Sequence, residues 1–497
     1  MKHSSHTRTL LPALAALTLV ACAVNPVSHK REVTFTTTAE EIAIGADQAR
    51  KVDEFMGLAG NAAQRAYIDK IGERLAALSP RQDVPYTFKI VDMKEPNAFA
   101  LPGGPIYVSR GLLALANSED EVACVIGHEI GHIAARHHSQ QQTRQAIASP
   151  FTAVTGLTGA ITGIVAPRIG AAISGAGALA AGGILASYSR EQERESDRIG
   201  IRLAAENGWD PEAMSMFLHT LSAEEVLQAG KQRESSFLDS HPATNERVEN
   251  TATEATSLER TARPPIAKNQ AAFFAELDGL VVGDDPGDGV FLDGRFVHPR
   301  LEVSIKFPES WESQNSHLFV AAADPKGKAL VMVTSPGEGD DPLRGAAAIN
   351  RKMGFNLSDV KTGKIADLSA ARYVAQTRSR GGPIAVDFTW FVYRGRIYQV
   401  IGAMPAPLYV EAENTFLDIA KSFRPMTEGE RQQIIERRLR IAKAREGETL
   451  RTLLERTNAA VSPAQAAVMN DMEMDTPLRS GQLVKIVKEQ VFTNSGR

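Results

Sequence analysis

Histidines gather in one short stretch near the end of the first quarter of the chain, VIGHEIGHIAARHH, at positions 128, 132, 137 and 138. His128 and His132 are four residues apart, so on a helix they share one face and can bind the same metal ion. Glu129 lies one step round the helix, where its carboxylate can take a proton from a metal-bound water. The pattern His-Glu-x-x-His on a helix therefore predicts one Zn²⁺ per chain, with Glu129 as the general base of a hydrolase.

The remaining histidines of this stretch fit the predicted site less well. On a continuous helix, His137 falls about 140° and His138 about 240° further round than His132. We therefore expect both to be exposed at the helix end, where positive charge is favourable, with a role at the rim of the site as the alternative. Cys124 lies one turn before His128, and the helix rise carries its thiol away from the metal, so we expect a small buried residue.

The third zinc ligand must come from another segment, because catalytic zinc usually takes three protein ligands and a water. The segment SREQERESD places Glu193 and Asp197 four residues apart on a second, charged helix. Glu193 is one candidate ligand among several neighbouring acids, and Asp197 can hold a ligand histidine through its second ring nitrogen. Glu191 and Glu195 are expected to point elsewhere, toward solvent.

Four segments, in this order, carry a family resemblance: NAFALPGGPIYVSRGLL, HEIGH, SREQERESDRIG and SHPATNER. Together they resemble the HtpX/CAAX-prenyl-protease family of gluzincin zinc metallopeptidases, and especially its periplasmic, BepA-like lipoprotein branch. The resemblance covers about residues 24–260 and implies that Glu193 is the third zinc ligand, with Asp197 as its partner. The chain departs from the family pattern at Ser196, where Ala is usual, and at Pro105.

The same resemblance implies further site residues. His241, in SHPATNER, corresponds to a histidine that can act as a fourth, regulatory zinc ligand and hold the enzyme latent; alternatively it only organises its loop. In zincins the edge of a sheet beside the helix binds substrate as an added strand, which suits unfolded polypeptides. Asn97 and Arg247 are candidates for substrate contact, the alternatives being a turn cap for Asn97 and a carboxylate contact for Arg247.

The elements that must position these residues are visible in the sequence. VPYTFKIVDM, at 84–93, predicts a strand, and two more extended segments flank the turn at 102–104. Ser118 and the acids that follow it predict the start of the helix that carries the histidines. Residues 151–187 are rich in Ala and Gly; Pro167 and many glycines favour a helical hairpin over a membrane span.

The N-terminus resembles a bacterial lipoprotein signal. A polar start and a short apolar run precede Leu-Val-Ala-Cys, so residues 1–21 are predicted to be removed and Cys22 to carry the lipid. Residues 22–37 then form a lipidated tether. Because no aspartate follows Cys22, the resemblance implies anchoring at the periplasmic side of an outer membrane.

Three folded parts are predicted after the tether, so the fold class is α+β and multidomain. Residues 38–262 form a mainly helical, zincin-type peptidase domain with a small sheet. Residues 275–425 are rich in strand patterns and resemble a PsbP-like α/β domain, interpreted as an accessory binding domain. Residues 426–497 are predicted to contain a charged helix followed by a small unit that resembles LysM modules, which implies contact with peptidoglycan.

Composition limits the functional classes. The chain is 43% hydrophobic and 23% charged with a net charge of −4, so nothing indicates a nucleic-acid partner. Two cysteines exclude a disulfide framework. The function predicted is a zinc endopeptidase of the cell envelope that hydrolyses misfolded or stalled envelope proteins, with unfolded or misassembled polypeptides as substrates. The alternative is a periplasmic chaperone or assembly factor whose protease activity is latent or minor.

Overall fold

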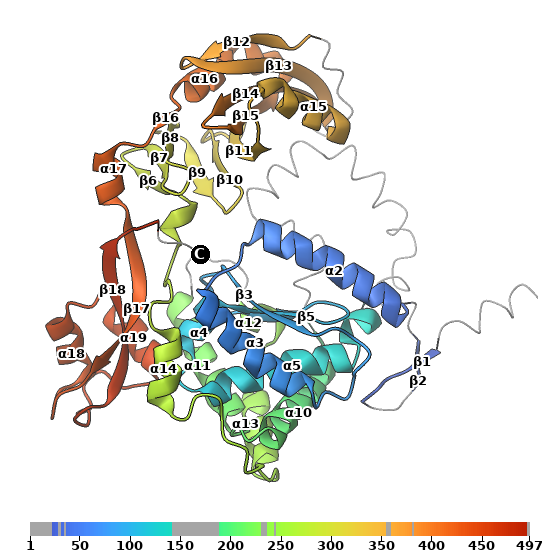
Figure 1. The fold of residues 1–497 in the computed structure, drawn as a ribbon, viewed down its shortest axis with the longest axis vertical. Coiled ribbons are helices and arrows are strands. Elements are labelled where there is room, and N and C mark those ends of the chain that lie inside the picture. The colour runs from blue at the N-terminus through green and yellow to red at the C-terminus, as the bar shows by residue number, and fades with distance from the viewer. Residues whose placement is uncertain are drawn as a thin grey trace, which may run out of the picture.

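The computed structural model describes residues 22–27, 31–33, 36–141, 188–229, 236–242, 245–353, 359–379 and 382–494. Figure 1 shows a lower body formed by the predicted peptidase domain and the C-terminal unit, and an upper body formed by the middle of the chain. The predicted signal segment 1–21 and the whole Ala/Gly-rich segment 151–187, with its predicted hairpin, fall outside the described residues. In the described part of the chain, no helix is both long and apolar enough to cross a membrane.

The first half of the peptidase domain contains the small predicted sheet. Its strand order is β3-β5-β4, with β3 and β5 parallel and β4 antiparallel at the edge. A short antiparallel pair, β1 and β2, precedes it. The elements are β1 (Cys22–Val24), β2 (Arg31–Val33), α2 (Thr38–Phe55), α3 (Ala62–Ala76), β3 (Thr87–Val91), β4 (Ala98–Ala100), β5 (Pro105–Ser109), α4 (Arg110–Leu115) and α5 (Glu119–Ala134).

The second half is helical and packs its first helix against α5. Its elements are α10 (Arg190–Glu206), α11 (Ala213–Gln228), α12 (Phe237–Ser240), α13 (Asn245–Ala255) and α14 (Gln270–Leu277). A Cβ added at Gly200 of α10 would lie 2.6 Å from the backbone nitrogen of His128, and one added at Gly127 would lie 2.8 Å from Gly200 O. Glycine at these positions is what lets the two backbones approach closely.

The middle of the chain folds into two antiparallel sheets; one apolar cluster contains residues of both sheets, and a second lies between the larger sheet and α15. The larger sheet has the order β12-β13-β14-β15-β11-β10-β9 and the smaller one β16-β8-β7-β6. The elements are η1 (Pro286–Asp288), β6 (Val290–Leu292), β7 (Arg295–His298), β8 (Val303–Lys306), β9 (Glu312–Asn315), β10 (Phe319–Ala323), β11 (Leu330–Glu338), α15 (Pro342–Met353), β12 (Lys361–Ile365), β13 (Leu368–Ser379), β14 (Gly382–Tyr393), β15 (Arg396–Pro405), η2 (Ala406–Leu408), α16 (Tyr409–Lys421) and β16 (Arg424–Pro425).

The C-terminal unit has the order strand, helix, helix, strand. After the short α17 (Glu428–Gln433) come β17 (Ile435–Lys443), α18 (Leu450–Thr457), α19 (Pro463–Asn470) and β18 (Leu483–Val491). The prediction of a long charged helix here is wrong over 435–443, which form β17. Leu439 pairs with Val487 of β18, and its backbone exchanges hydrogen bonds with Gly279 and Leu280. These long-range partners outweigh the local helical propensity of the arginine-rich segment.

The C-terminal unit is joined to the peptidase domain by a shared core. Leu439, Met469 and Val487 belong to the same apolar cluster as the residues around α5. Buried Lys485 of β18 donates hydrogen bonds of 2.7 to 3.0 Å to three carbonyls at the end of α4. A cation is favourable there because it meets the negative end of a helix.

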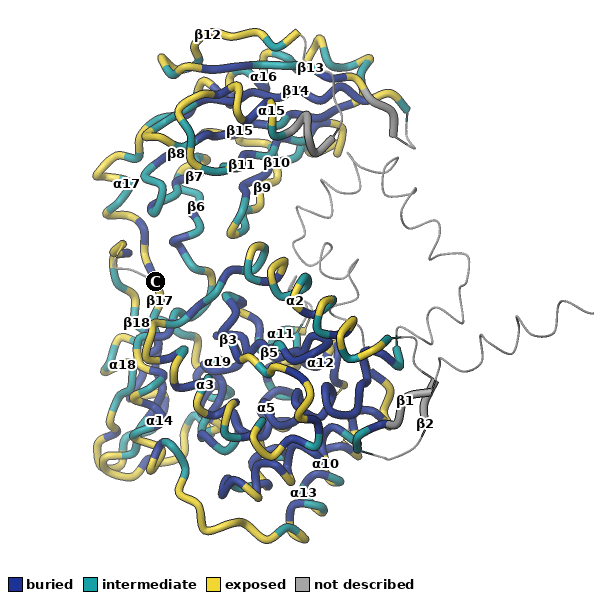
Figure 2. The backbone as a smooth tube through the Cα atoms, turned by 45° about the vertical axis from the view of Figure 1, so that its right-hand side comes forward, coloured by how far each residue is buried: buried dark blue, intermediate teal, exposed yellow. Residues whose placement is uncertain are grey.

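The two chain segments that connect the lower body to the upper body run side by side at one place. Val282 N–H donates to Arg437 O at 2.9 Å, and Val281 forms a β-bridge with Arg438. The chain therefore leaves the lower body and returns to it at this neck. Figure 2 shows that α5 is buried along its length, whereas α2 lies on the outside of the same body and is mostly intermediate or exposed.

Candidate metal centre

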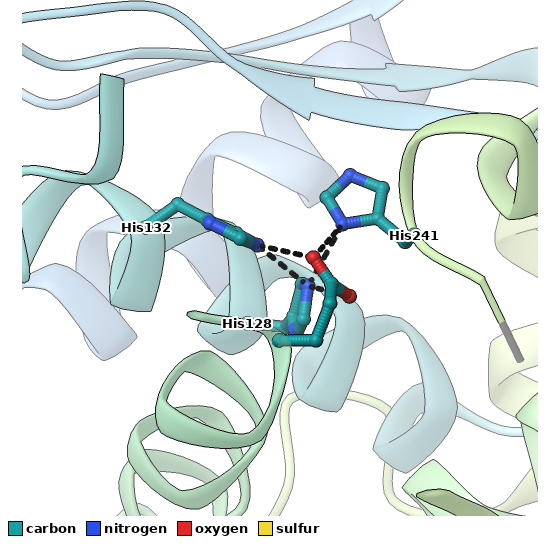
Figure 3. A group of neighbouring side chains, drawn as sticks. His128, His132 and His241 are labelled. Carbon is teal, nitrogen blue, oxygen red and sulfur yellow. Dashed lines mark hydrogen bonds and ion pairs between the residues drawn. The ribbon is translucent and has the colours of Figure 1, made fainter. Parts of the chain in front are cut away.

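The two predicted zinc ligands on α5 turn inward together. His128 and His132 are fully buried, and their Nε2 atoms lie 2.9 Å apart. Ser118 is the N-cap of their helix, and its hydroxyl accepts a hydrogen bond from the backbone N–H of Glu121, as predicted from the sequence. Figure 3 shows both rings directed toward a common point that the ring of His241 also faces.

Two residues from other segments reach the same point. Glu193 Oε1, on α10, lies 3.3 Å from His132 Nε2. His241, which directly follows α12, places Nδ1 3.0 Å from Glu193 Oε1 and 3.2 Å from His128 Nε2. All four side chains are buried, and one ligand atom from each lies within 4.8 Å of the others.

These separations suit a tetrahedral metal ion. Zinc binds imidazole nitrogen and carboxylate oxygen at about 2.0–2.2 Å, so ligand atoms at the corners of a tetrahedron lie about 3.3–3.6 Å apart. The five close contacts among the four side chains measure 2.9 to 3.6 Å. The donor set of three imidazoles and one carboxylate is also one that zinc accepts.

Asp197 and Arg247 hold the ligands from behind. Asp197 Oδ1 lies 2.9 Å from His128 Nδ1 and accepts its proton, which leaves His128 Nε2 free to face the metal. Arg247 donates to both oxygens of Asp197, at 2.7 and 2.8 Å, and lies 2.8 Å from Glu193 Oε2. Arg247 is 3% exposed, so in this conformation it contacts carboxylates; a direct contact with substrate stays a prediction.

The carboxylates that support the site are held in their charged form. Burial raises the pKa of Glu193, but the charges of His241 and Arg247 outweigh this effect and keep that pKa well below its ordinary value. Burial also raises the pKa of Asp197, and the charge of Arg247 together with the hydrogen bond to His128 again lowers it below the ordinary value. Both groups are thus ionised, as a metal site requires.

Glu129 has a different environment on the same helix. Its side chain is fully buried, and neither carboxylate oxygen makes a well-formed hydrogen bond with the described residues. Burial raises its pKa, and the neighbouring His241 and His128 offset only part of that shift. A carboxylate with unused oxygens and a raised pKa beside a metal position has the properties of a general base.

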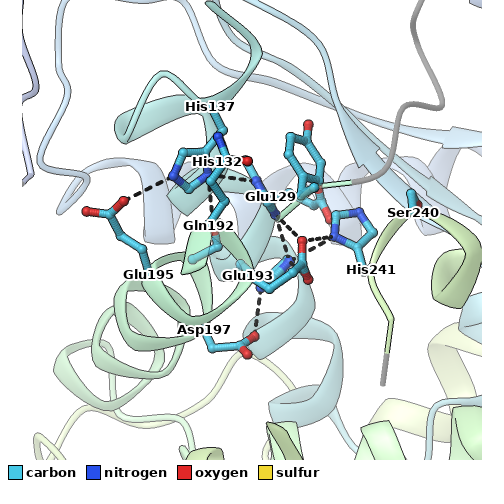
Figure 4. A network of polar contacts seen from close by, with 12 residues as sticks. Glu129, His132, His137, Gln192, Glu193, Glu195, Asp197, Ser240 and His241 are labelled. Atoms are coloured by element: carbon cyan, nitrogen blue, oxygen red, sulfur yellow. Dashed lines mark hydrogen bonds and ion pairs between the residues drawn. The ribbon is translucent and has the colours of Figure 1, made fainter. Parts of the chain in front are cut away.

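His137 and His138 are buried, contrary to the prediction that they are exposed. The helix α5 ends at Ala134, and Arg136 takes a left-handed conformation with φ of 57°, so the chain turns back toward the site. His137 Nδ1 then lies 2.9 Å from His132 Nδ1, and its Nε2 lies 3.1 Å from Glu195 Oε2. Figure 4 shows this chain of contacts, which also gives Glu195 a partner inside the protein.

Tyr188 is a site residue that the sequence reasoning missed. Its ring stacks on His132 with 3.9 Å between ring centres, and its hydroxyl lies 2.7 Å from His138 Nε2. His138 Nε2 also lies 2.8 Å from Ala100 O on the edge strand, and burial lowers the pKa of His138 to about 4. No local pattern marks Tyr188, because its role depends on a contact with a helix about fifty residues earlier.

Asn97 and Cys124 lie in buried structural positions. Asn97 is fully buried before β4, and its backbone exchanges hydrogen bonds of 2.8 Å with Ser109. A contact between Asn97 and substrate therefore stays a prediction. Cys124 is buried and its thiol lies 3.6 Å from Asp210 O, in agreement with the expectation of a small buried residue.

Two histidines on one helix converge with a glutamate from a second helix, and a buried glutamate lies between the two histidines in the sequence. This arrangement is typical of the centre of a metallopeptidase. Residues 62–255 match the model of Peptidase family M48. By this match residues 62–255 are similar to M48 metallopeptidase domains, and the predicted resemblance to a zinc metallopeptidase family, BepA-like branch included, is confirmed.

Individual relatives agree with this assignment. The beta-barrel assembly-enhancing protease of Yersinia pestis is 31% identical over 239 residues, which are 48% of this chain and 48% of that protein. The Escherichia coli metalloprotease YcaL is 28% identical over 186 residues, 36% of this chain and 68% of the relative. The chain spans about half the length of the assembly-enhancing proteases that it matches.

Among solved structures, cyanobacterial PsbP from Synechocystis is similar at 11% identity, with a TM-score of 0.23, over 29% of this chain and 98% of that one. A TM-score this low does not establish a shared fold, so the PsbP-like assignment of 275–425 stays a prediction.

Proposed function

We propose that the protein is a zinc-dependent endopeptidase of the bacterial cell envelope that hydrolyses misfolded or stalled envelope proteins. One observation carries the chemistry: the ligand atoms of His128, His132 and Glu193 converge at the separations of a tetrahedral metal site, next to the buried carboxylate of Glu129. The M48 match of residues 62–255 supports the same reaction class.

Each residue has a defined task in peptide hydrolysis. His128, His132 and Glu193 would hold the zinc, which supplies Lewis acidity and an acidified water when bound. Glu129 accepts the proton of the attacking water and passes it to the leaving amine. Asp197 and Arg247 keep His128 and the carboxylate of Glu193 oriented throughout.

The substrate class follows from main-chain recognition at a sheet edge. Among the described strands β4 pairs with β5 alone, so we propose that its outer side accepts an extended polypeptide as an added strand. This mode tolerates many side chains, which suits unfolded proteins. The names of the assembly-enhancing relatives refer to beta-barrel assembly, which supports β-barrel proteins as substrates. We also propose that Cys22 carries a lipid, that the protein is located at the periplasmic side of an outer membrane and that the C-terminal unit contacts peptidoglycan.

Removal of the metal tests the reaction class. Purified protein should cleave an unfolded substrate such as casein, lose this activity after treatment with a chelator and regain it with about one equivalent of Zn²⁺. The measurement is peptide release together with metal content. Cleavage that survives complete zinc removal would refute the proposal, and murein release without casein cleavage would indicate a cell-wall hydrolase instead.

In this conformation the site is closed, because His241 lies where a fourth metal ligand would lie. With His241 as fourth ligand, the metal would have no place for the catalytic water, because four protein ligands are typical of structural zinc. The residue is held firmly: Phe237 stacks on its ring at 4.4 Å, and Arg247 donates to its carbonyl at 3.1 Å. Phe237 N–H also donates to Pro96 O at 2.8 Å, beside β4.

The proposed substrate edge is also buried in this conformation. The residues of β4 are at most 4% exposed. Movement of α12 and His241 would free the fourth position at the metal and break the hydrogen bond beside β4 together. We therefore propose that His241 acts as a latch on the metal site and that this conformation is the latent one.

Replacement of the latch tests this part. The variant His241→Ala should raise casein cleavage by about tenfold if the latch is closed in nine of ten molecules. The variant His219→Ala is a suitable control, because His219 is exposed on α11 and lies away from the ligand set. Unchanged or lower activity of His241→Ala, at equal zinc content, would count against the latch.

The closed form is also the observation that favours the second candidate function. A periplasmic chaperone or assembly factor with latent or minor proteolysis would use the same closed site. If a chain with Glu129→Gln still complements an envelope-stress defect in cells, proteolysis is not its main task.

A further inference from the structure

His132 is supported in a different way from its partner ligand. His128 Nδ1 faces the carboxylate of Asp197 directly, at 2.9 Å. Behind His132 there is a second imidazole, His137, and only behind that a carboxylate, Glu195. The two zinc ligands of α5 therefore have unlike supports.

The direction of the hydrogen bonds follows from the chemistry at the outer end. An ionised carboxylate can only accept, so Glu195 takes the proton on His137 Nε2. A neutral imidazole carries one N–H, which makes His137 Nδ1 an acceptor. His132 Nδ1, 2.9 Å away, must then donate, and the lone pair of His132 Nε2 is left to face the metal.

We propose that His137, kept in one tautomer by Glu195, is a positioning residue that fixes the tautomer of His132 for zinc binding. The inference rests on the proposed metal site and deepens it. The surroundings agree with this role: His137 is fully buried away from bulk solvent, and the left-handed Arg136 directs it inward.

Two neighbouring contacts hold this geometry. Arg136 donates to Glu41 at 2.7 and 2.9 Å, which secures the turn before His137. Ser196 Oγ lies 3.3 Å from His137 Nδ1, and because that nitrogen is an acceptor the serine hydroxyl can donate to it. This contact gives a role to the serine that stands where alanine is usual in the family.

The test compares two substitutions of similar size. His137→Asn keeps an acceptor near the Nδ1 position, whereas His137→Leu has none. In competition with a chromogenic chelator, His137→Leu should bind Zn²⁺ about 10- to 100-fold more weakly than wild type. His137→Asn should recover most of that loss.

A spectroscopic readout separates positioning from folding. In the Co²⁺-substituted protein, His137→Leu should change the visible absorption bands of the bound ion, while the unfolding midpoint of the metal-free protein stays near that of wild type. Glu195→Ala should weaken zinc binding in the same direction. Glu191→Ala, an exposed acid of the same helical turn, should not.

The outcomes distinguish this inference from the proposed function. If His137→Leu binds zinc as tightly as wild type, or if Asn and Leu weaken binding equally, the positioning role is wrong while the metal site stands. If the wild-type protein binds no zinc, or binds it no more tightly than Glu193→Gln does, the proposed metal site itself fails.

Discussion

The variant Glu129→Gln should lose proteolytic activity by about a hundred- to ten-thousand-fold, the usual contribution of a general base. Glutamine has nearly the same shape but cannot accept the proton of the attacking water. Because Glu129 is not among the four converging ligands, the variant should still contain about one zinc per chain. The measurements are the rate of casein cleavage and metal content on the same sample.

A matched control for this variant is available in the same domain. Glu249 is exposed on α13, and Glu249→Gln should leave activity and zinc content unchanged. If Glu129→Gln cleaves casein at the wild-type rate, another group is the base. The inactive variant also traps substrates, and mass spectrometry of the trapped proteins would identify the natural substrate class.

The variant Glu193→Gln should lose most of its zinc, and activity with it. A neutral amide is a poor ligand, and the buried Arg247 then loses one of its two carboxylate partners. We expect the zinc affinity to fall by more than the roughly 10- to 100-fold that loss of an outer support costs. Chelator competition and metal analysis after dialysis measure this loss.

The control for this second variant lies two residues earlier. Glu191 is exposed in the same first turn of α10, so Glu191→Gln should retain zinc. Full zinc occupancy in Glu193→Gln would show that a different residue is the third ligand. Melting curves of the metal-free proteins should be recorded as well, because Glu193 also pairs with Arg247.

Much of the site was predictable because its information is local. The capped start of α5 and the spacing of His128 and His132 are short-range patterns, and the structure confirms the helix and the convergence of the two rings. The strands over 87–91, 98–100 and 105–109 likewise follow alternation and turn signals. Glu193 could be chosen among its neighbours only through the family resemblance.

The remaining errors have long-range causes. The position of His137 depends on the left-handed turn at Arg136, which is held by Glu41, 95 residues earlier in the chain. The local sequence predicts a continuous helix, and on such a helix the ring of His137 would face away from His128 and His132. Likewise, the segment over 435–443 becomes a strand because β18 and the stretch at 279–282 supply its partners. Neither partner is visible in a local window.

The neck at Val281 and Arg438 has a consequence for how the chain is made. The lower body is encoded in two parts of the chain, one before and one after the upper body, and its apolar core includes Leu439, Met469 and Val487 from the second part. A chain delivered N-terminus first therefore presents its HEIGH segment long before that core is complete. We expect the metal site to reach its final stability only after the C-terminal unit has been synthesised.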